Sequence, residues 1–358
     1  MPDRKEKMFN FIQHCRLMFK EKPLGKYDYC FLIKRNKKFL NPLKNSFPKG
    51  ILKVMLGLTY KCQCGCSYCG CAVYDKNRTE LSCSVFKNII REISNLSYFF
   101  ICISFFGGEP LLRKDIFELI AFTRKQGLFC ELDSNGILLT SENVKQLKKA
   151  GLHHIFVSID STDSVEHDKI KNINGCYQAA VEGIKNCLKE NLSCSISTYA
   201  SRKNILTGEI GRIVELGRKL RVSSVRILSP AAIKRWRDES SGEELNDEEK
   251  GKLKRFLEPK FVYLESTKCN RPAASKRCAC LDKGFFYISP YGDVQPCPYF
   301  PVSFGNITGE LPLNAILERM WSEQIFNDYK DTDCLTNNSM VRDYFAKINS
   351  RRIFPINY

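Results

Sequence analysis

The chain has 358 residues, 43% of them hydrophobic and 27% charged, and its formal net charge is +17. This length permits one sizeable core with a smaller appended unit, and the balance of residues excludes a disordered chain. No apolar run reaches the roughly eighteen residues of a membrane span, and no secretory signal is recognisable, so we expect a cytoplasmic protein without a membrane span.

The charge and the cysteines narrow the expected chemistry. Lysine and arginine are spread along the whole chain, so a solvated basic surface is the preferred interpretation and a nucleic-acid-binding patch is the alternative. Eighteen cysteines are the unusual feature of the composition. Because no export signal is present, disulfides are disfavoured, and thiolates that bind metal or act in catalysis become the better interpretation.

The N-terminal extension, residues 1–50, is basic and aromatic. An amphipathic pattern from Met8 to Phe19 predicts a helix that docks on the body of the protein rather than on a membrane.

Residues 51–230 alternate short β-rich runs with helical patterns, which is typical of βα units around a parallel sheet. The predicted strands are Lys53–Thr59, Phe99–Phe105, Phe129–Ser134, Ile155–Ile159, Ser193–Thr198 and Ser224–Leu228. The predicted helices are Val85–Leu96, Ile116–Gln126, Glu142–Ala150, Tyr177–Lys189 and Glu209–Leu220. Ser141 is the expected N-cap of one helix, and Gly151 is placed to end it. This pattern predicts an α/β fold, a partial (β/α)6 barrel, because a full barrel needs eight units.

The C-terminal third has a different pattern. Residues 231–268 are charged and poor in apolar residues, which predicts a linker that carries a helix. A small α+β unit with cysteines follows at 269–335, and a basic tail at 336–358. In that unit, the run Phe285–Ser289, a Pro-Tyr-Gly-Asp turn and a return strand predict a β-hairpin that brings Cys280 near Cys297.

The strongest chemical signal follows the first predicted strand. Cys62, Cys66 and Cys69 have the spacing C-x3-C-x2-C on one tight loop, and three thiolates can hold three irons of a [4Fe-4S] cluster. The fourth iron is then left without a protein ligand, and an open position on a metal is where a substrate or cofactor binds. Cys64 and Cys71 leave other triplets open. A structural zinc knuckle would instead call for paired C-x2-C units.

This loop resembles that of the radical SAM superfamily, in which the open iron is chelated by the amino and carboxylate groups of S-adenosylmethionine. Only the triplet of Cys62, Cys66 and Cys69 has the family spacing. Tyr68 also fits, because the family usually has an aromatic residue before the third cysteine.

Further segments similar to family motifs follow successive predicted strands, where barrel enzymes place their sites. They resemble the GGEP motif, the TNG segment, the VSLDG segment and the HDxIR segment. The resemblance implies contacts with S-adenosylmethionine at Tyr68, Gly107, Gly108, Glu109, Pro110, Ser134, Asn135, Ser158, Asp160 and Lys171. Lys171 stands where arginine is usual, and lysine lacks the bidentate fork for a carboxylate. His167 is expected to cap a helix or bond to backbone rather than to act in catalysis.

The C-terminal unit is similar to the SPASM/Twitch extension of radical SAM enzymes, which binds one or two auxiliary iron–sulfur clusters. The resemblance rests on a C-x11-G-x4-C pattern from Cys280 to Cys297, followed by Gly-Asn-Ile. It implies one auxiliary cluster on Cys280, Cys297 and Cys334, with Cys278 or Cys269 as fourth ligand or with that position open. A disulfide between Cys280 and Cys297 is the alternative.

The resemblance implies an oxidoreductase that works under anaerobic conditions. It would cleave S-adenosylmethionine reductively to methionine and a 5′-deoxyadenosyl radical, with flavodoxin or ferredoxin as electron donor, and the radical would take a hydrogen atom from the substrate. We place oxidative modification of a peptide or protein ahead of small-molecule oxidation or decarboxylation, for example of a heme precursor. A zinc-binding nucleic-acid module and an RNA-modifying radical enzyme are the further alternatives.

Overall fold

The computed structural model describes residues 49–74, 77–231, 233, 245–258, 261–265, 280–281, 283–329, 334–348 and 355–357. The helix expected at Met8–Phe19 lies outside the described residues, and so do Cys269 and Cys278.

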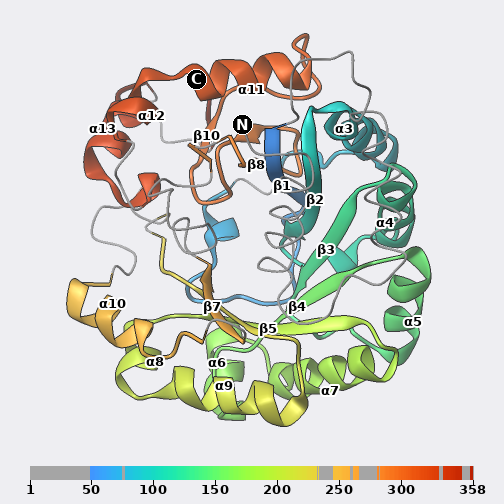
Figure 1. The fold of residues 1–358 in the computed structure, drawn as a ribbon, viewed down its shortest axis with the longest axis vertical. Coiled ribbons are helices and arrows are strands. Elements are labelled where there is room, and N and C mark those ends of the chain that lie inside the picture. The colour runs from blue at the N-terminus through green and yellow to red at the C-terminus, as the bar shows by residue number, and fades with distance from the viewer. Residues whose placement is uncertain are drawn as a thin grey trace, which may run out of the picture.

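Six parallel strands form the centre of the molecule, in the order in which they occur along the chain. They are β1 (Lys49–Thr59), β2 (Tyr98–Gly107), β3 (Phe129–Ser134), β4 (His154–Ser158), β5 (Ser193–Tyr199) and β6 (Val225–Leu228). Figure 1 shows them curving around a central axis, with helices on the outside only. The predicted partial barrel is confirmed, and so are its six strands to within a few residues at their ends.

The helices that connect these strands cover the outer face of the barrel (Figure 1). They are α3 (Cys83–Asn95), α4 (Ile116–Lys125), α5 (Ser141–Ala150), α6 (Ser164–Lys171), α7 (Cys176–Lys189), α8 (Arg202–Leu206) and α9 (Glu209–Leu220). Thr140, not Ser141, caps α5, because its side chain accepts a hydrogen bond from the amide of Asn143. Gly151 ends the helix as predicted, with a left-handed φ of 93°.

The sheet extends beyond the six strands on both edges. Strand β7 (Val262–Glu265) pairs parallel with β6, a strand that the sequence analysis missed inside the predicted linker. On the other edge, β8 (Phe285–Ile288) pairs parallel with β1, and β9 (Val294–Gln295) returns antiparallel to β8. The predicted hairpin is therefore present, and it attaches the C-terminal unit directly to the first strand of the barrel. The helix expected in the linker is α10 (Asp247–Lys254), which starts with a capping box at Asn246.

The remaining C-terminal elements lie together at one end of the view in Figure 1. They are α11 (Leu313–Ser322), α12 (Gln324–Asp328), η4 (Leu335–Asn337), α13 (Ser339–Ile348) and the short parallel pair β10 (Val302–Ser303) and β11 (Ile356–Asn357).

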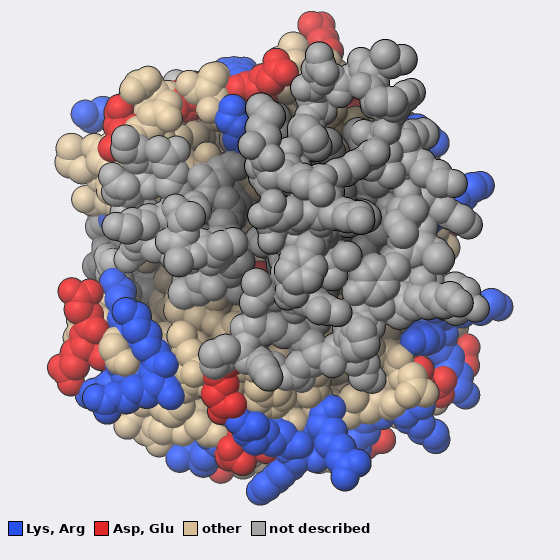
Figure 2. Space-filling model, viewed as in Figure 1, with Lys and Arg blue, Asp and Glu red and all other residues tan. Residues whose placement is uncertain are grey.

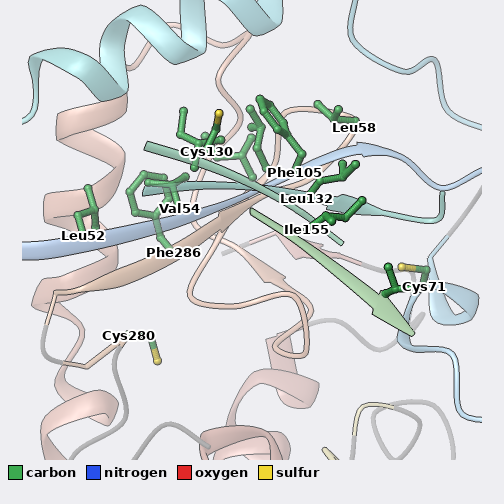
Figure 3. Close-up of a cluster of buried hydrophobic side chains, with 14 of the residues drawn as sticks. Leu52, Val54, Leu58, Cys71, Phe105, Cys130, Leu132, Ile155, Cys280 and Phe286 are labelled. Carbon is green, nitrogen blue, oxygen red and sulfur yellow. The ribbon is translucent and has the colours of Figure 1, made fainter. Parts of the chain in front are cut away.

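A single buried apolar cluster joins the barrel to the C-terminal unit. Val54 of β1 and Phe286 of β8 are register partners and lie side by side in this cluster (Figure 3). Leu132 of β3 and Ile155 of β4 continue the cluster across the sheet. The hairpin is thus held by core packing as well as by strand pairing, so the C-terminal unit can form a fixed wall of a site.

Acidic side chains stand among the basic side chains along the lower edge of the molecule in Figure 2. This distribution agrees with a solvated basic surface on the part of the chain that the figure shows in colour. Within the described residues, no helix combines the length and the apolar character that a bilayer crossing requires.

Candidate active site

A cavity opens at the carboxyl ends of the parallel strands, where the loops after β1, β2, β3 and β4 come together. Most of the residues expected to contact S-adenosylmethionine line it, together with the predicted cysteine triplet. From the predicted set these are Cys62, Cys66, Tyr68, Cys69, Gly107, Gly108, Ser134, Asn135, Ser158, Asp160 and Lys171. Tyr287, Pro298 and Tyr299 of the C-terminal unit line the same cavity. The structure therefore brings the separate sequence motifs to one place.

The C-terminal end of α6 binds the backbone of the cysteine loop. The amide of Gly65 donates to the carbonyl of Lys171 at 2.9 Å, and the amide of Ser67 donates to the carbonyl of Ile170 at 3.3 Å. Because the last carbonyls of a helix have no partner inside it, they are available to bind such a loop. These two contacts hold the loop through its backbone.

Cys64 and Cys71, the two other cysteines of the loop region, make hydrogen bonds of their own. Hydrogen bonds to the thiols of Cys176, Cys62 and Cys66 raise the pKa of Cys64 far above its ordinary value. The same contact with Cys64 lowers the pKa of Cys62 to about 6. Cys71 is buried, and its thiol donates to the carbonyl of Gly107 at 3.1 Å. Cys71 is therefore directed at a backbone carbonyl, whereas Cys64 lies among the other thiols of the loop.

The glycine pair after β2 is required by close backbone packing. A Cβ atom on Gly107 would lie 2.2 Å from the carbonyl oxygen of Thr59, and one on Gly108 would lie 2.2 Å from that of Lys61. Gly107 also has a φ of +136°, which L side chains rarely adopt. The amides of Gly108 and Glu109 donate to these carbonyls at 2.6 and 2.9 Å, which joins the loop after β2 to the loop after β1.

Glu109 and Pro110 do not line the cavity but are buried behind it. The carboxylate of Glu109 accepts hydrogen bonds from the amide of Asn135 at 2.8 Å and from the hydroxyl of Ser134 at 3.1 Å. Burial raises the pKa of Glu109 to about 7, although these hydrogen bonds act in the opposite direction. Glu109 therefore positions the segment after β3 instead of facing a ligand directly.

Asp160 and Lys171 form a buried ion pair at 2.6 Å. Tyr68 joins it, because its hydroxyl donates to Asp160 and accepts from Lys171. The Tyr68 ring stacks on Tyr199 at 4.3 Å between centroids. Burial raises the pKa of Asp160, but the attraction of Lys171 outweighs it and holds this pKa below its ordinary value. His167, as expected, bonds to backbone, since its Nδ1 accepts from the amide of Asp160 at 3.1 Å.

A buried network of charged side chains, which the sequence analysis missed, reaches the cavity through Asp133 and Arg226. Arg226 is buried over the ring of Phe156 at 3.7 Å and pairs with Asp133 and, at 2.9 Å, with Glu265. Lys53 pairs with the same Glu265 at 3.1 Å and with Glu131 at 2.7 Å. The sequence did contain a sign of this network. Glu131 and Asp133 stand at alternate positions of an otherwise apolar strand, and alternate side chains of a strand point to the same face. We therefore name Lys53, Glu131, Asp133, Arg226 and Glu265 the ionic floor.

The three cysteines expected to bind an auxiliary cluster come from separate segments. Cys280 is buried beside β8, Cys297 follows β9, and Cys334 precedes η4. In Figure 3, Cys280 lies well apart from Cys71 of the cysteine loop region. The fourth candidate, Cys278, is outside the described residues.

The donor set on the cysteine loop fits a cluster better than a single ion. The thiolates around one zinc ion lie about 2.3 Å from it and hence about 4 Å from each other. Among the residues that the structure describes, no three Cys, His, Asp or Glu side chains are grouped to hold one metal ion. An iron–sulfur cube instead takes each thiolate on a different iron, so its ligands need not converge on one point. Cys62, Cys66 and Cys69, facing one cavity from one loop, satisfy that requirement.

Comparison with known proteins decides the family. Residues 56–203 match the radical SAM superfamily. That stretch, which is less than half of the chain, is a radical SAM domain. The match begins in β1 and ends in α8, so it includes the cysteine loop, the glycine pair and α6. It leaves no support for the alternative of a zinc-binding nucleic-acid module.

Curated relatives of this radical SAM protein have more than one function. An AdoMet-dependent heme synthase of Methanosarcina barkeri is 28% identical over 80% of this chain and 87% of its own length. A PqqA peptide cyclase of Bradyrhizobium diazoefficiens is 26% identical over 78% of this chain and 76% of its own length.

Solved structures agree on the fold. Streptococcus suis SuiB bound to S-adenosylmethionine superposes with a TM-score of 0.58 at 14% identity, over 98% of this chain and 87% of that chain. Native anSMEcpe with bound AdoMet and Kp18Cys peptide superposes with a TM-score of 0.61 at 15% identity, over 81% of this chain and 87% of that chain. These likenesses support the radical SAM partial barrel as the architecture.

Proposed function

We propose that this radical SAM protein holds a [4Fe-4S] cluster on Cys62, Cys66 and Cys69 and uses it to cleave S-adenosylmethionine reductively. The observation that carries the proposal is the convergence of these three thiols with the glycine pair on one cavity. When bound, the cluster and the sulfonium cofactor supply C–S bond cleavage and hydrogen-atom abstraction, chemistry that no side chain performs.

The chain's own residues provide the position and shape of the site. The α6 carbonyls fix the cysteine loop, and Glu109 fixes the segment of Ser134 and Asn135. The amide side chain of Asn135 reaches back to the loop and donates to Gln63 at 3.2 Å. Such contacts keep the cofactor end of the cavity in one geometry, which favours reaction over side reactions of the bound cofactor.

For the substrate, we propose oxidative modification of a peptide or protein. A relative named PqqA peptide cyclase supports this class, as does the fold shared with SuiB, which has been solved with its precursor peptide SuiA. The cavity also has the required breadth, since it extends from the cysteine loop to Tyr299 of the C-terminal unit. Its tyrosines offer apolar contact to a peptide side chain, and Asp133 and Arg226 of the ionic floor offer charge.

Oxidation or decarboxylation of a heme precursor is the second candidate. It is supported by the relative named AdoMet-dependent heme synthase, which aligns over most of both chains. The cavity would also suit a flat ring system, because aromatic side chains line it: Tyr60, Tyr74, Phe106, Tyr287 and Tyr299.

An auxiliary iron–sulfur cluster in the C-terminal unit is part of the proposal. Cys280, Cys297 and Cys334 are its proposed ligands, with Cys278 as the fourth, and a flavodoxin or ferredoxin is the proposed electron donor. The pairing of β8 with β1 supports this arrangement, because it fixes the C-terminal unit next to the cavity that would receive the substrate.

The test is an anaerobic assay with S-adenosylmethionine and dithionite. We expect 5′-deoxyadenosine by mass spectrometry, and loss of it when Cys62 is replaced by alanine. The substrate is then tested with a peptide encoded beside the gene and, separately, with Fe-coproporphyrin III. A mass decrease of either compound with equal formation of 5′-deoxyadenosine identifies the class. Wild-type protein with iron that forms no 5′-deoxyadenosine contradicts the proposed function.

A further inference from the structure

Lys171 uses all the hydrogen-bond donors of its ammonium group inside the protein. Its Nζ lies 2.6 Å from Asp160 Oδ2, 2.7 Å from Ser158 Oγ and 2.8 Å from Tyr68 Oη. An ammonium group has three N–H donors, whereas a guanidinium group has five. An arginine at this position could bind these partners and a ligand, but a lysine with three partners has no N–H left for a carboxylate. The side chain is only 3% exposed, so a change of partner would require rearrangement of buried groups.

The partners of Lys171 lead to the cysteine loop. Tyr68 immediately precedes Cys69, and its hydroxyl is bound between Lys171 and Asp160. Asp160 is itself fixed, since its other oxygen accepts from the amide of Tyr199 at 2.8 Å. The backbone of Lys171 adds a second connection, through the hydrogen bond from Gly65. Lys171 therefore holds the loop at two points. Its carbonyl binds Gly65, just before Cys66, and its side chain binds Tyr68, just before Cys69.

We propose that Lys171 is a positioning residue that, with Asp160, clamps Tyr68 and thereby sets the geometry of the cluster-binding loop, instead of binding the carboxylate of S-adenosylmethionine. This inference rests on the proposed function, because it assigns a role within the same site. Residues behind the ligands of a metal site typically change metal affinity about 10- to 100-fold when they are removed.

The experiment compares iron and sulfide content, the EPR spectrum of the reduced cluster and the Kd of S-adenosylmethionine after anaerobic reconstitution. Lys171→Met is expected to bind the cluster about 10-fold more weakly and to show an altered EPR spectrum before S-adenosylmethionine is added. Lys171→Arg is expected to restore both, because arginine can keep the contacts with Asp160 and Tyr68. Lys169→Met, on the exposed face of the same helix, is the matched control and should behave as wild type.

The opposite result is equally clear. If Lys171→Met kept its iron and its EPR spectrum but bound S-adenosylmethionine about 10-fold more weakly, Lys171 would be a ligand of the cofactor and the inference would be wrong. Tyr68→Phe serves where Lys171→Met does not fold, since it leaves the ion pair in place. Our inference predicts an altered cluster spectrum for Tyr68→Phe, and an unchanged spectrum overturns it. Wild-type protein that binds no cluster at all would instead contradict the proposed function, so the two failures are distinguishable.

Discussion

The two sides of the cavity are built in different ways. The loop side, residues 60–69, 107–110, 134–136 and 158–171, consists of short segments tied to each other by backbone hydrogen bonds, by close contact at the glycine pair and by the buried side chains of Glu109 and Lys171. The C-terminal side, residues 283–300, contributes large side chains such as Tyr287 and Tyr299 from a hairpin packed into the core. A fixed backbone suits a cofactor that never changes, whereas a wall of side chains can vary with the substrate. The predictions below test this division.

Cysteine substitutions should separate the two sides most strongly. Alanine at Cys62, Cys66 or Cys69 is expected to abolish 5′-deoxyadenosine formation, because each removes a thiolate from the proposed cluster. Alanine at Cys297 should remove only the iron of the auxiliary cluster and leave the reductive cleavage of S-adenosylmethionine in place. Iron analysis and mass spectrometry measure both outcomes, with Cys83→Ala in α3 as the control. Equal loss of cleavage in all variants would show that the two sides are not independent.

Substitutions in the ionic floor should change the free energy of unfolding. Arg226→Met leaves Asp133 without its buried cation, while Glu265 keeps Lys53, and breaking a buried ion pair typically costs about 3 to 5 kcal/mol of unfolding free energy. Arg255→Met, at an exposed position after α10, should change it by less than about 0.5 kcal/mol. Anaerobic urea unfolding measures the difference. A loss below about 1 kcal/mol for Arg226→Met would mean that the floor tolerates unpaired carboxylates, and a substrate cation would then be the natural partner for them.

The contrast between the sides also explains how far the sequence predicts the structure. Motifs of the loop side are contiguous, and each follows a strand with a clear apolar pattern, so both the barrel and the cofactor end of the cavity can be predicted. The pairing of β8 with β1 cannot, because no local pattern states which edge a distant hairpin joins. The partners of Lys171 cannot be predicted for the same reason, because Tyr68 comes from the cysteine loop and Ser158 and Asp160 lie at and just after the end of β4. Strand β7 was missed because it is short and charged at Glu265, whose carboxylate is neutralised only in the folded barrel.

Glycine substitutions test whether the loop side depends on backbone contact. Gly108→Ala brings a Cβ atom within 2.2 Å of the carbonyl oxygen of Lys61, a backbone atom that cannot move without shifting the cysteine loop. We expect a loss of about 3 kcal/mol in unfolding free energy, at the upper end of overpacking effects. Gly251→Ala is the matched control, since a Cβ there meets no atom within 4 Å and the residue lies in α10, so stability should rise by up to about 1 kcal/mol. Equal stability of the two variants would contradict the close packing of the loops.

The smallest expected effect concerns Glu109, the carboxylate behind the loop side. Burial raises its pKa from an ordinary value of 4.5 to about 7, so between these two pH values the folded state keeps a proton that the unfolded state has already released. Since stability falls with pH wherever the folded state holds more protons, Glu109 alone should lower the unfolding free energy by about 2 kcal/mol between about pH 5 and pH 8.

Glu109→Gln removes the titration but keeps an oxygen that can accept from Ser134 and Asn135. As the pH rises, the unfolding free energy of the wild type should therefore fall relative to that of Glu109→Gln. A difference that is constant with pH would mean that Glu109 is already ionised in the fold, held by its hydrogen bonds in spite of its burial.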